Sequence, residues 1–470
     1  MAGKMEESLK ILRQKVFSFG FHVIEGENTY LLFDIDNLSL FEVNLFTYNL
    51  FLQIQSGMDI ECIIKDYGYE NLKDFYEIVG RTNHNENAPN KVQKRALNRL
   101  VLNISNDCNL NCRYCYASEG SYNEEKSFME EKAAIKIIDY FYNIYDDIDN
   151  IQFFGGEPLL NAEIIDPVCS YILTKYDAGE ITKLPVFSAV TNGTIMSPEI
   201  LRVFSTYKIE ATVSIDGPSF IHDYLRGKGT FEKIINNIQK MKDNNIDIGV
   251  KCTFTNYHLI NDFDVFNLME FFYNQFGIHI THIPFVATTE ENELYIHLDD
   301  LVKGYTKASK FTLDSIGKAN YIVDSYTLRL IKAILYKEKI EFYCPAGITT
   351  LSVSTDGEIY PCFMFTGKKE FSVGNVLKNE IDSFKLGEVN NLLKRANKLD
   401  NPKCKNCWVR SLCFGCIGND YIVTGSIEDK PSCDFIKRFI ENFLLEFAQI
   451  SRDSSALLPV VSLIESVKNK

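Results

Sequence analysis

The sequence predicts an α/β fold in which a parallel sheet is open or curled into a partial (β/α)6 barrel resembling a TIM barrel. Three observations predict it: six short runs typical of strands, longer helical patterns between them, and glycine- or turn-rich segments directly after several runs. Strands that alternate with helices form βα units, whose strands lie parallel. In such folds the chemistry collects at the carboxyl ends of the strands.

The predicted strands and helices alternate regularly through the central part of the chain. The six predicted strands are 96–105, 151–156, 185–193, 210–217, 246–255 and 279–286. Helical patterns such as EEKAAIKIIDYFYNIY and FEKIINNIQKMKDN fill the gaps, with apolar residues every three or four positions. The predicted barrel domain therefore covers residues 96–320.

Two further domains flank the predicted barrel. Residues 1–90 contain two or three short strand patterns and then amphipathic helices, and the polar stretch 81–91 indicates a linker. Residues 335–440 are dense in cysteine and poor in long periodic patterns, so they require bound metal to fold stably. Their TLSVSTDGEIYPC segment predicts a hairpin. Residues 441–470 predict an amphipathic helix packed on the barrel.

Composition excludes several classes of partner. The net charge of -14 and the pI of about 5.1 argue against nucleic acid, because phosphate binding requires a basic face. No apolar run approaches the roughly 20 residues that span a bilayer, so no membrane partner is expected. The first residues, MAGKMEESLK, lack the apolar core of a signal peptide, which favours a cytoplasmic location.

The thirteen cysteines are clustered. In a reducing compartment clustered cysteines are more often metal ligands than disulfides. Three lie at 108–115 and seven between 344 and 433. The isolated Cys62, Cys169 and Cys252 lie in apolar surroundings and are interpreted as small buried apolar residues.

Cys108, Cys112 and Cys115 form the first cluster, in CNLNCRYCY, directly after the first predicted strand. Three thiolates on a 4Fe–4S cluster leave one iron without a protein ligand, where a small molecule can chelate. A zinc site or a fully ligated electron-transfer cluster would require a fourth ligand nearby. No cysteine or histidine follows at a suitable spacing.

This loop resembles that of the radical S-adenosylmethionine (SAM) superfamily, and FFGGEPLL after the second predicted strand resembles the family's glycine-rich GGEP motif. The resemblance implies that the cluster cleaves SAM to a 5′-deoxyadenosyl radical. It implies that Tyr114 lies near the adenine. It also assigns the SAM amino group to Gly155, Gly156 and Glu157, where backbone must approach the ligand closely.

The segments TNG and SIDGP end the third and fourth predicted strands, and Arg226 follows in HDYLRGKGTF. In the family these positions contact the ribose and carboxylate of SAM. The resemblance assigns Ser214 and Arg226 to the carboxylate, with Asn192 and Asp216 as further contacts. A turn-forming Asp-Gly pair is the equally weighted alternative for Asp216.

The second cysteine array resembles the SPASM domain, which binds two auxiliary 4Fe–4S clusters and so makes three clusters with the first. By the family pattern, the outer cluster is held by Cys404, Cys407, Cys413 and Cys433. The inner cluster is held by Cys344, Cys362 and Cys416. A fourth inner ligand usually follows the first cysteine closely, but PAGITTLSV has none, so an open iron is predicted. A zinc ribbon and an electron carrier are the alternatives.

The resemblance implies that the chain is an enzyme that modifies peptides. The favoured hypothesis is thioether crosslinking of a ribosomally made precursor peptide, as in the sactipeptide and ranthipeptide class. The substrate thiolate would bind the open inner iron, an electron donor such as flavodoxin or ferredoxin would be needed, and no side chain would act as nucleophile. Residues 18–80 resemble a winged-helix-like domain that binds a leader peptide as an added strand. Simple packing on the barrel is the alternative.

Anaerobic sulfatase maturation and carbon–carbon crosslinking are the competing functions. Sulfatase-maturing enzymes usually carry Asp after the cysteine that is Cys362 here, where this chain has Phe363. They also usually fill the inner cluster and lack so long an N-terminal extension. The sequence leaves open the substrate and whether Cα or Cβ is attacked.

Overall fold

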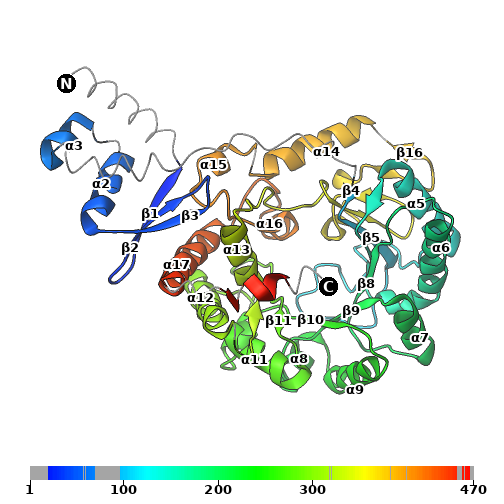
Figure 1. Ribbon diagram of the computed structural model, residues 1–470. Helices are drawn as coiled ribbons and strands as arrows, with labels where there is room; N and C mark the ends of the chain where they lie inside the picture. The colour runs from blue at the N-terminus through cyan, green and yellow to red at the C-terminus, as the bar shows by residue number, and fades with distance from the viewer. Residues whose placement is uncertain are drawn as a thin grey trace.

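The computed structural model describes residues 20–56, 58, 60–68, 96–316, 318, 320–381, 383–398, 400–452, 458–459 and 461–465. The predicted linker at 81–91 lies outside these residues. Figure 1 shows a curved sheet with helices on its outer side, a small N-terminal unit at one end, and the cysteine-dense segment between them. Within the described part of the chain, no helix combines the length and apolar character that crossing a membrane requires.

The main sheet has seven strands in the order β10-β9-β8-β7-β5-β13-β14. Their bounds are β5 (Arg99–Ser105), β7 (Asn150–Gly155), β8 (Val186–Thr191), β9 (Glu210–Ser214), β10 (Ile248–Lys251), β13 (Thr350–Val353) and β14 (Ile359–Tyr360). Pairing is parallel throughout except between β13 and β14. The first five predicted strands and the parallel sheet are confirmed, with the first strand divided into β4 (Ala96–Leu97) and β5.

Helices cover the outer face of this sheet because each strand exposes alternate residues to them. The helices between strands include α5 (Glu131–Ile144), α6 (Ile165–Asp177), α7 (Pro198–Tyr207), α8 (Ser219–Arg226), α9 (Thr230–Asp243), α10 (Asn256–Leu259) and α11 (Val265–Phe276). Leu100, Leu102 and Ile104 of β5 belong to the core shared with these helices. On the opposite face of β5, Asn103 donates to Thr366 Oγ1 at 2.6 Å, which joins the barrel to the cysteine-dense segment.

The sixth predicted strand is much shorter than 279–286. Only β11 (Ile280–Thr281) forms, and it pairs in parallel with β12 (Val323–Asp324). Two single bridges, from Lys251 to His282 and from Phe254 to Phe285, connect this region to the end of β10. The barrel is therefore partial.

The hairpin predicted in the cysteine-dense segment is confirmed, since β13 and β14 pair antiparallel around Gly357, whose φ is +86°. The prediction missed its placement: β13 also pairs in parallel with β5. This pairing satisfies the edge of β5, which would otherwise present unpaired backbone groups. The cysteine-dense segment thus shares the core of the barrel.

The described N-terminal unit is an antiparallel sheet followed by two helices, as predicted. Its elements are β1 (Phe21–Glu25), β2 (Tyr30–Asp34), β3 (Ser39–Val43), α2 (Leu45–Gln55) and α3 (Ile60–Tyr67). Leu32, Leu50 and Phe51 form the centre of a small separate core.

The interpretation of the isolated cysteines is confirmed for two of the three. Cys169 and Cys252 are buried, whereas Cys62 is exposed on α3. Ile63 is 2% exposed and takes the inward position beside it. Because neighbouring residues of a helix point in different directions, only one of the two can face the core.

Helix α17 (Cys433–Ser451) packs along α12 (Leu298–Ser315), which confirms a C-terminal helix on the barrel, although it begins before residue 441. Ile440, Phe443 and Leu444 form the centre of the buried face of α17.

Replacing Phe443 by Ala should destabilise the protein by about 3–5 kcal/mol, because the side chain is 1% exposed and leaves a cavity between α12 and α17. Thermal unfolding of the reconstituted protein would measure the change. Phe220→Ala is the matched control: Phe220 is 52% exposed and should cost no more than about 0.5 kcal/mol. Equal effects of the two substitutions would contradict this packing.

Candidate functional site

The loop after β5 carries Cys108, Cys112 and Cys115 and is fixed to the carboxyl end of β8. Asn192 Nδ2 donates to Asn109 Oδ1 at 2.8 Å and lies 3.8 Å from Cys108 Sγ. The Leu110 N–H donates to the same sulfur at 3.4 Å. Burial raises the pKa of Cys108 to about 12, and the neighbouring thiols add to this shift. Three neighbouring, partly desolvated thiols would repel one another as thiolates. Iron ions of a bound iron–sulfur cluster would compensate that negative charge.

Gly155 and Gly156 pack against the backbone of this loop. A Cβ atom at Gly155 would lie 2.2 Å from the Ser105 carbonyl oxygen, and one at Gly156 would lie 2.4 Å from that of Asp107. Gly155 also has a φ of +143°. The Gly156 N–H donates to Ser105 O at 2.9 Å. These glycines therefore permit a close approach between two protein segments, whereas their predicted contact with SAM remains a prediction.

Glu157 is fully buried and links the first cysteine loop to β8, because its N–H donates to Asp107 O at 2.8 Å while its carboxylate binds the end of β8. Its oxygens accept from Thr191 Oγ1 at 2.7 Å, the Asn192 N–H at 2.7 Å and the Leu159 N–H at 3.0 Å. Burial raises the pKa of Glu157 to about 7, against the effect of these hydrogen bonds. The carboxylate predicted to receive the SAM amino group thus already has a structural role.

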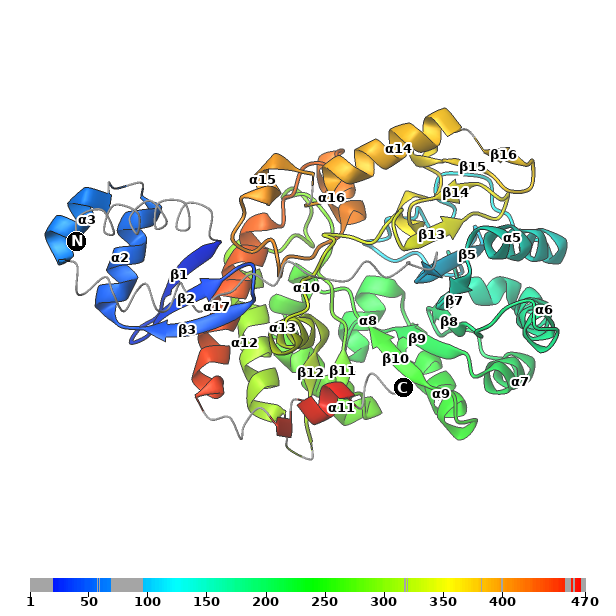
Figure 2. The same cartoon turned by 45° about the horizontal axis from the view of Figure 1, so that its top comes forward.

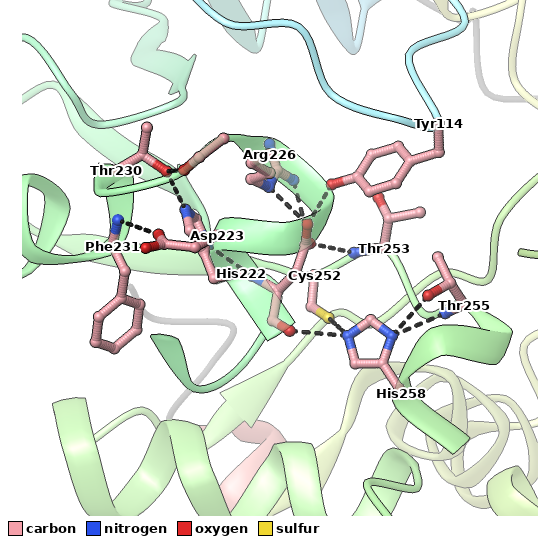
Figure 3. Close-up of polar contacts among 12 residues, drawn as sticks. Tyr114, His222, Asp223, Arg226, Thr230, Phe231, Cys252, Thr253, Thr255 and His258 are labelled. Atoms are coloured by element: carbon pink, nitrogen blue, oxygen red, sulfur yellow. Dashed lines mark hydrogen bonds and ion pairs between the residues drawn. The ribbon is translucent and has the colours of Figure 1, made fainter. Parts of the chain in front are cut away.

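Tyr114, Arg226 and Thr253 lie close together in Figure 3, and all three donate hydrogen bonds to the carboxylate of Asp216. Arg226 donates from Nε at 2.8 Å and from Nη2 at 3.2 Å, Thr253 donates its N–H at 3.0 Å, and Tyr114 donates its hydroxyl. Asp216 is 0% exposed. Its carboxylate therefore joins three distant segments and does more than form a local Asp-Gly turn.

Burial alone would raise the pKa of Asp216, but the guanidinium of Arg226 outweighs it and holds the pKa below its usual range. Arg226 also contacts the Cys112 thiol and lowers its pKa against the larger effect of burial. The predicted SAM-contacting residues Tyr114, Asp216 and Arg226 thus form one group beside the first cysteine loop. Ser214 ends β9 nearby, paired in register with Lys251.

The sequence analysis missed the residues that support this group from the other side. His258 Nε2 contacts the Asp216 carbonyl oxygen at 2.8 Å, and its Nδ1 contacts Thr255 Oγ1 at 2.9 Å. His222 Nδ1 lies 3.3 Å from the Asp216 backbone nitrogen. The Thr255–His258 capping box was present in TNYHL as a helix-start signal. Its link to Asp216 depends on tertiary structure.

The predicted inner ligands Cys344, Cys362 and Cys416 lie together. Cys344 and Cys416 are hydrogen-bonded to each other, which lowers the pKa of Cys344 and raises that of Cys416. Both lie near Cys362. Two backbone N–H groups hydrogen-bond to each sulfur. They come from residues 346 and 417 for Cys344, 363 and 364 for Cys362, and 418 and 419 for Cys416. Such bonds stabilise thiolate ligands of iron–sulfur clusters.

The predicted outer ligands Cys404, Cys407, Cys413 and Cys433 line one enclosed pocket. Lys398 donates to the Cys413 carbonyl oxygen at 2.9 Å. Among the described residues, no three His, Cys, Asp or Glu side chains are grouped so that they could hold a single metal ion. A 4Fe–4S cluster is larger than one ion, so its thiolates stand further apart than those of a single-ion site. Both cysteine sets supply the thiolate donors that such a cluster requires.

Aromatic and basic side chains lie between the first cysteine loop and the inner set. Tyr116 lies near Cys115 and Cys362, and the desolvation of its hydroxyl by the surrounding protein raises its pKa. The rings of Phe154 and Phe363 are in contact at 4.4 Å between centroids and are tilted by 36°, and Lys251 Nζ lies 6.0 Å from the centroid of the Phe363 ring. Burial also lowers the pKa of Lys251. Of these positions, only Phe363 was singled out from the sequence, as the residue that follows Cys362.

Comparisons with known proteins identify two domains. Residues 102–272 match the radical SAM superfamily, and residues 344–408 match SPASM, an iron–sulfur cluster-binding domain. Such domains imply 4Fe–4S clusters and SAM as cofactors.

The relatives belong to several kinds of maturation protein. The radical SAM cyclopropyl synthase TigE of Paramaledivibacter caminithermalis is 24% identical over 89% of this chain and 93% of that protein. A cysteine-type anaerobic sulfatase-maturating enzyme of Clostridium novyi is 24% identical over 76% of this chain and 98% of that protein. The antilisterial bacteriocin subtilosin biosynthesis protein AlbA of Bacillus subtilis is 23% identical over 74% of this chain and 77% of that protein. The structure of anSMEcpe with bound AdoMet has a TM-score of 0.65 at 20% identity and covers 78% of this chain and 98% of that one. This similarity shows a shared fold.

Gly156→Ala should destabilise the protein by about 1–3 kcal/mol and lower the iron bound by the first loop, because the added methyl overlaps the Asp107 carbonyl. Iron content after anaerobic reconstitution and thermal unfolding would measure both effects. Gly387→Ala is the matched control, since a Cβ there meets nothing within 4 Å and should stabilise α14 (Ser383–Ala396) by about 0.5–1 kcal/mol. A Gly156→Ala protein with full iron and stability would refute the close approach.

Asp216→Ala should cost about 3–5 kcal/mol because it leaves Arg226 buried without its partner. A depressed pKa contributes stability above the unfolded value near 3.8, and this contribution is lost only as pH falls through the lower folded pKa. The cost should therefore stay constant between about pH 6 and 8. Urea unfolding of Asp216→Ala, Arg226→Met and the double variant would measure the coupling, and additive costs would contradict it.

Proposed function

We propose that this radical SAM enzyme, whose partial barrel is followed by a SPASM domain, forms thioether crosslinks in a ribosomally made precursor peptide. The proposed bond joins a cysteine sulfur of the peptide to Cα or Cβ of another residue. The proposal assigns the predicted N-terminal domain, residues 1–90, to leader recognition. It assigns 96–320 to radical generation, 335–440 to the auxiliary clusters and 441–470 to a packing helix.

The observation that carries the proposal is the inner set of three cysteines. Cys344, Cys362 and Cys416 lie together in the structure, and the segment after Cys344 offers no further cysteine. Three protein thiolates would leave one coordination position of a 4Fe–4S cluster for a thiolate of the substrate, since thiolates are good iron ligands. Tyr116 and Phe363 lie between this position and the first cysteine loop.

The residues of the chain would position and shield the reactants. When bound, the first cluster would supply the reductive cleavage of SAM to methionine and a 5′-deoxyadenosyl radical, and the auxiliary clusters would accept the electron left over after coupling. The peptide would lose one hydrogen atom to that radical, which becomes 5′-deoxyadenosine, together with one thiol proton and one electron as its carbon–sulfur bond forms. Tyr114, Asp216 and Arg226 would orient SAM, while Phe154 and Phe363 would exclude water.

Sulfatase maturation fits this chain less well. The sulfatase-maturating relative is covered over 98% of its length but matches only 76% of this chain, so this chain has additional residues. The described N-terminal unit, residues 20–68, accounts for part of this difference. The residue after Cys362 is Phe363, which cannot act as a base, and its ring packs against that of Phe154. A peptide substrate is consistent with both functions, because anSMEcpe also binds a peptide together with AdoMet.

Carbon–carbon bond formation is the second candidate function. The match to the cyclopropyl synthase TigE favours it, because that match covers 89% of this chain, against 74% for the subtilosin protein AlbA. Both functions begin with the removal of a hydrogen atom from the peptide. They differ in whether a substrate sulfur enters the product.

An anaerobic assay of the reduced, reconstituted enzyme with SAM and a Cys-rich precursor peptide would test the proposal. We expect 5′-deoxyadenosine, a mass loss of two hydrogens per crosslink, and substrate thiols that no longer react with an alkylating reagent. The same mass loss with thiols still reactive would identify carbon–carbon coupling instead. An electron donor of the flavodoxin or ferredoxin class should support the reaction in place of dithionite.

Cys416→Ala should lower the iron content and abolish peptide crosslinking, because Cys416 is assigned to the inner cluster. Iron content, 5′-deoxyadenosine and peptide mass would be measured on the same preparation. Cys169→Ala is the matched control, since Cys169 is 0% exposed in the apolar core and should leave iron content unchanged. Unchanged iron and SAM cleavage in Cys416→Ala would show that the ligand assignment is wrong.

A further inference from the structure

An open cleft of about 710 Å³ lies between the N-terminal unit and the outer cysteine loop. Figure 2 shows the two sides: β1 on one side, and α15 (Pro402–Lys405) with the start of α17 on the other. The N-terminal side contributes Phe21, His22 and Ile35, and the other side contributes Trp408 and several cationic side chains.

Positive charge dominates the lining of this cleft. Its charged side chains are those of Lys403, Lys405, Arg410 and Lys437, and no carboxylate is among the lining residues. Arg410 is already paired with Asp36 through two 2.8 Å contacts, which also hold the two sides together. Within the described ranges, no ion pair is formed by the three lysines. In a chain with a net charge of -14, this is a local concentration of unneutralised positive charge.

The floor of the cleft is aromatic. The rings of His22 and Trp408 stack with 3.9 Å between centroids and 9° between planes. Burial lowers the pKa of His22 to about 4, so the imidazole is neutral near pH 7 and adds no charge to the floor. An apolar, planar floor beneath a cationic rim suits a peptide segment with both apolar and acidic side chains.

We propose that this cleft binds an acidic segment of the precursor peptide. The inference rests on the proposed function and adds a location and a charge class to it. The volume falls within the roughly 300–1,000 Å³ of sites for small ligands, so it admits a short extended segment but not a folded protein. Strand β1 lies at an edge of its sheet and borders the cleft, so its backbone is placed to pair with such a segment.

The position of the cleft would also orient the substrate. Cys407, Arg410 and Lys437 line both the cleft and the pocket of the outer cysteines. A peptide held here therefore lies beside the SPASM side of the molecule, from which the inner set follows along the chain at Cys416. The acidic segment would serve as an anchor, while the residues to be modified remain free to reach the barrel.

The fluorescence of Trp408 would test the proposal directly, because it is the only tryptophan of the chain and lies in the cleft. The probe is an acetylated peptide of Glu and Leu without aromatic residues, added to the reconstituted enzyme without SAM. We expect a saturable change in emission that weakens as salt rises, and none with a Lys/Leu peptide. No change with the Glu/Leu peptide would overturn the proposal. Binding is measured without turnover, so this result is independent of the crosslinking assay.

The triple variant Lys403→Glu, Lys405→Glu, Lys437→Glu should weaken the probe by about tenfold or more, since each exposed pair is worth up to roughly 1 kcal/mol. Lys132→Glu, Lys228→Glu, Lys233→Glu is the matched control, with the same change in net charge at exposed sites on α5, on α9 and in the turn between α8 and α9. It should bind almost as wild type does. Equal weakening in both triples would assign the effect to net charge and overturn the proposal.

Iron content and the visible spectrum of both triples would be recorded, because Lys403 and Lys437 adjoin the cysteines of the outer pocket. If the lysines only balanced the charge of the outer cluster, their reversal would change the spectrum and leave peptide binding intact, which would overturn the proposal. Displacement of the peptide by an acidic ferredoxin would fit a shared basic rim. Binding of the ferredoxin but not of the peptide would identify a redox protein as the occupant and refute ours.

Discussion

The parallel pairing of β13 with β5 is the constraint on which the arrangement of both cysteine arrays depends. Strand β5 leads into the loop of the first array at Cys108, while β13 and β14 are enclosed in sequence by Cys344 and Cys362. The register of one strand pair therefore sets the separation between the two arrays. A shift by one residue would turn alternate side chains to the opposite face and remove the first array from the inner set.

Backbone contacts then hold the first loop against its neighbouring strands. Gly155 and Gly156 allow two segments to meet more closely than any side chain would permit, and the carboxylate of Glu157 binds the end of β8. The carboxylate of Asp216 joins Tyr114 of the first loop to Arg226 and Thr253. These carboxylates are buried and fully engaged, so they rigidify the loop whose geometry a cluster and SAM would require.

The sequence was sufficient for the features whose signals are local. The alternation of strands with helices predicted the parallel sheet, and CNLNCRYCY and GGEP predicted the neighbouring loops that the structure brings together. The long-range pairing of β13 with β5 was not predictable, because a four-residue strand carries no signal for its partner. The network of His258 and the exposure of Cys62 likewise depend on which neighbours the fold supplies. Whether a glycine serves a turn or a close approach cannot be decided from the sequence, because the answer depends on the backbone that it contacts.

Side chains that already form hydrogen bonds within the protein are less able to recognise a substrate than side chains that do not. The carboxylates of Glu157 and Asp216 already accept several hydrogen bonds within the protein, so they are poorly placed to distinguish one peptide from another. Phe363 and Lys251, in contrast, lie between the first cysteine loop and the inner set with aromatic and charged surface still unused by hydrogen bonds among the described residues. Under the proposed function, selection at the reacting carbon would fall to these side chains, and selection of the peptide as a whole to surfaces outside the barrel. A rigid centre with separate recognition surfaces would allow one radical-generating site to act on different peptides.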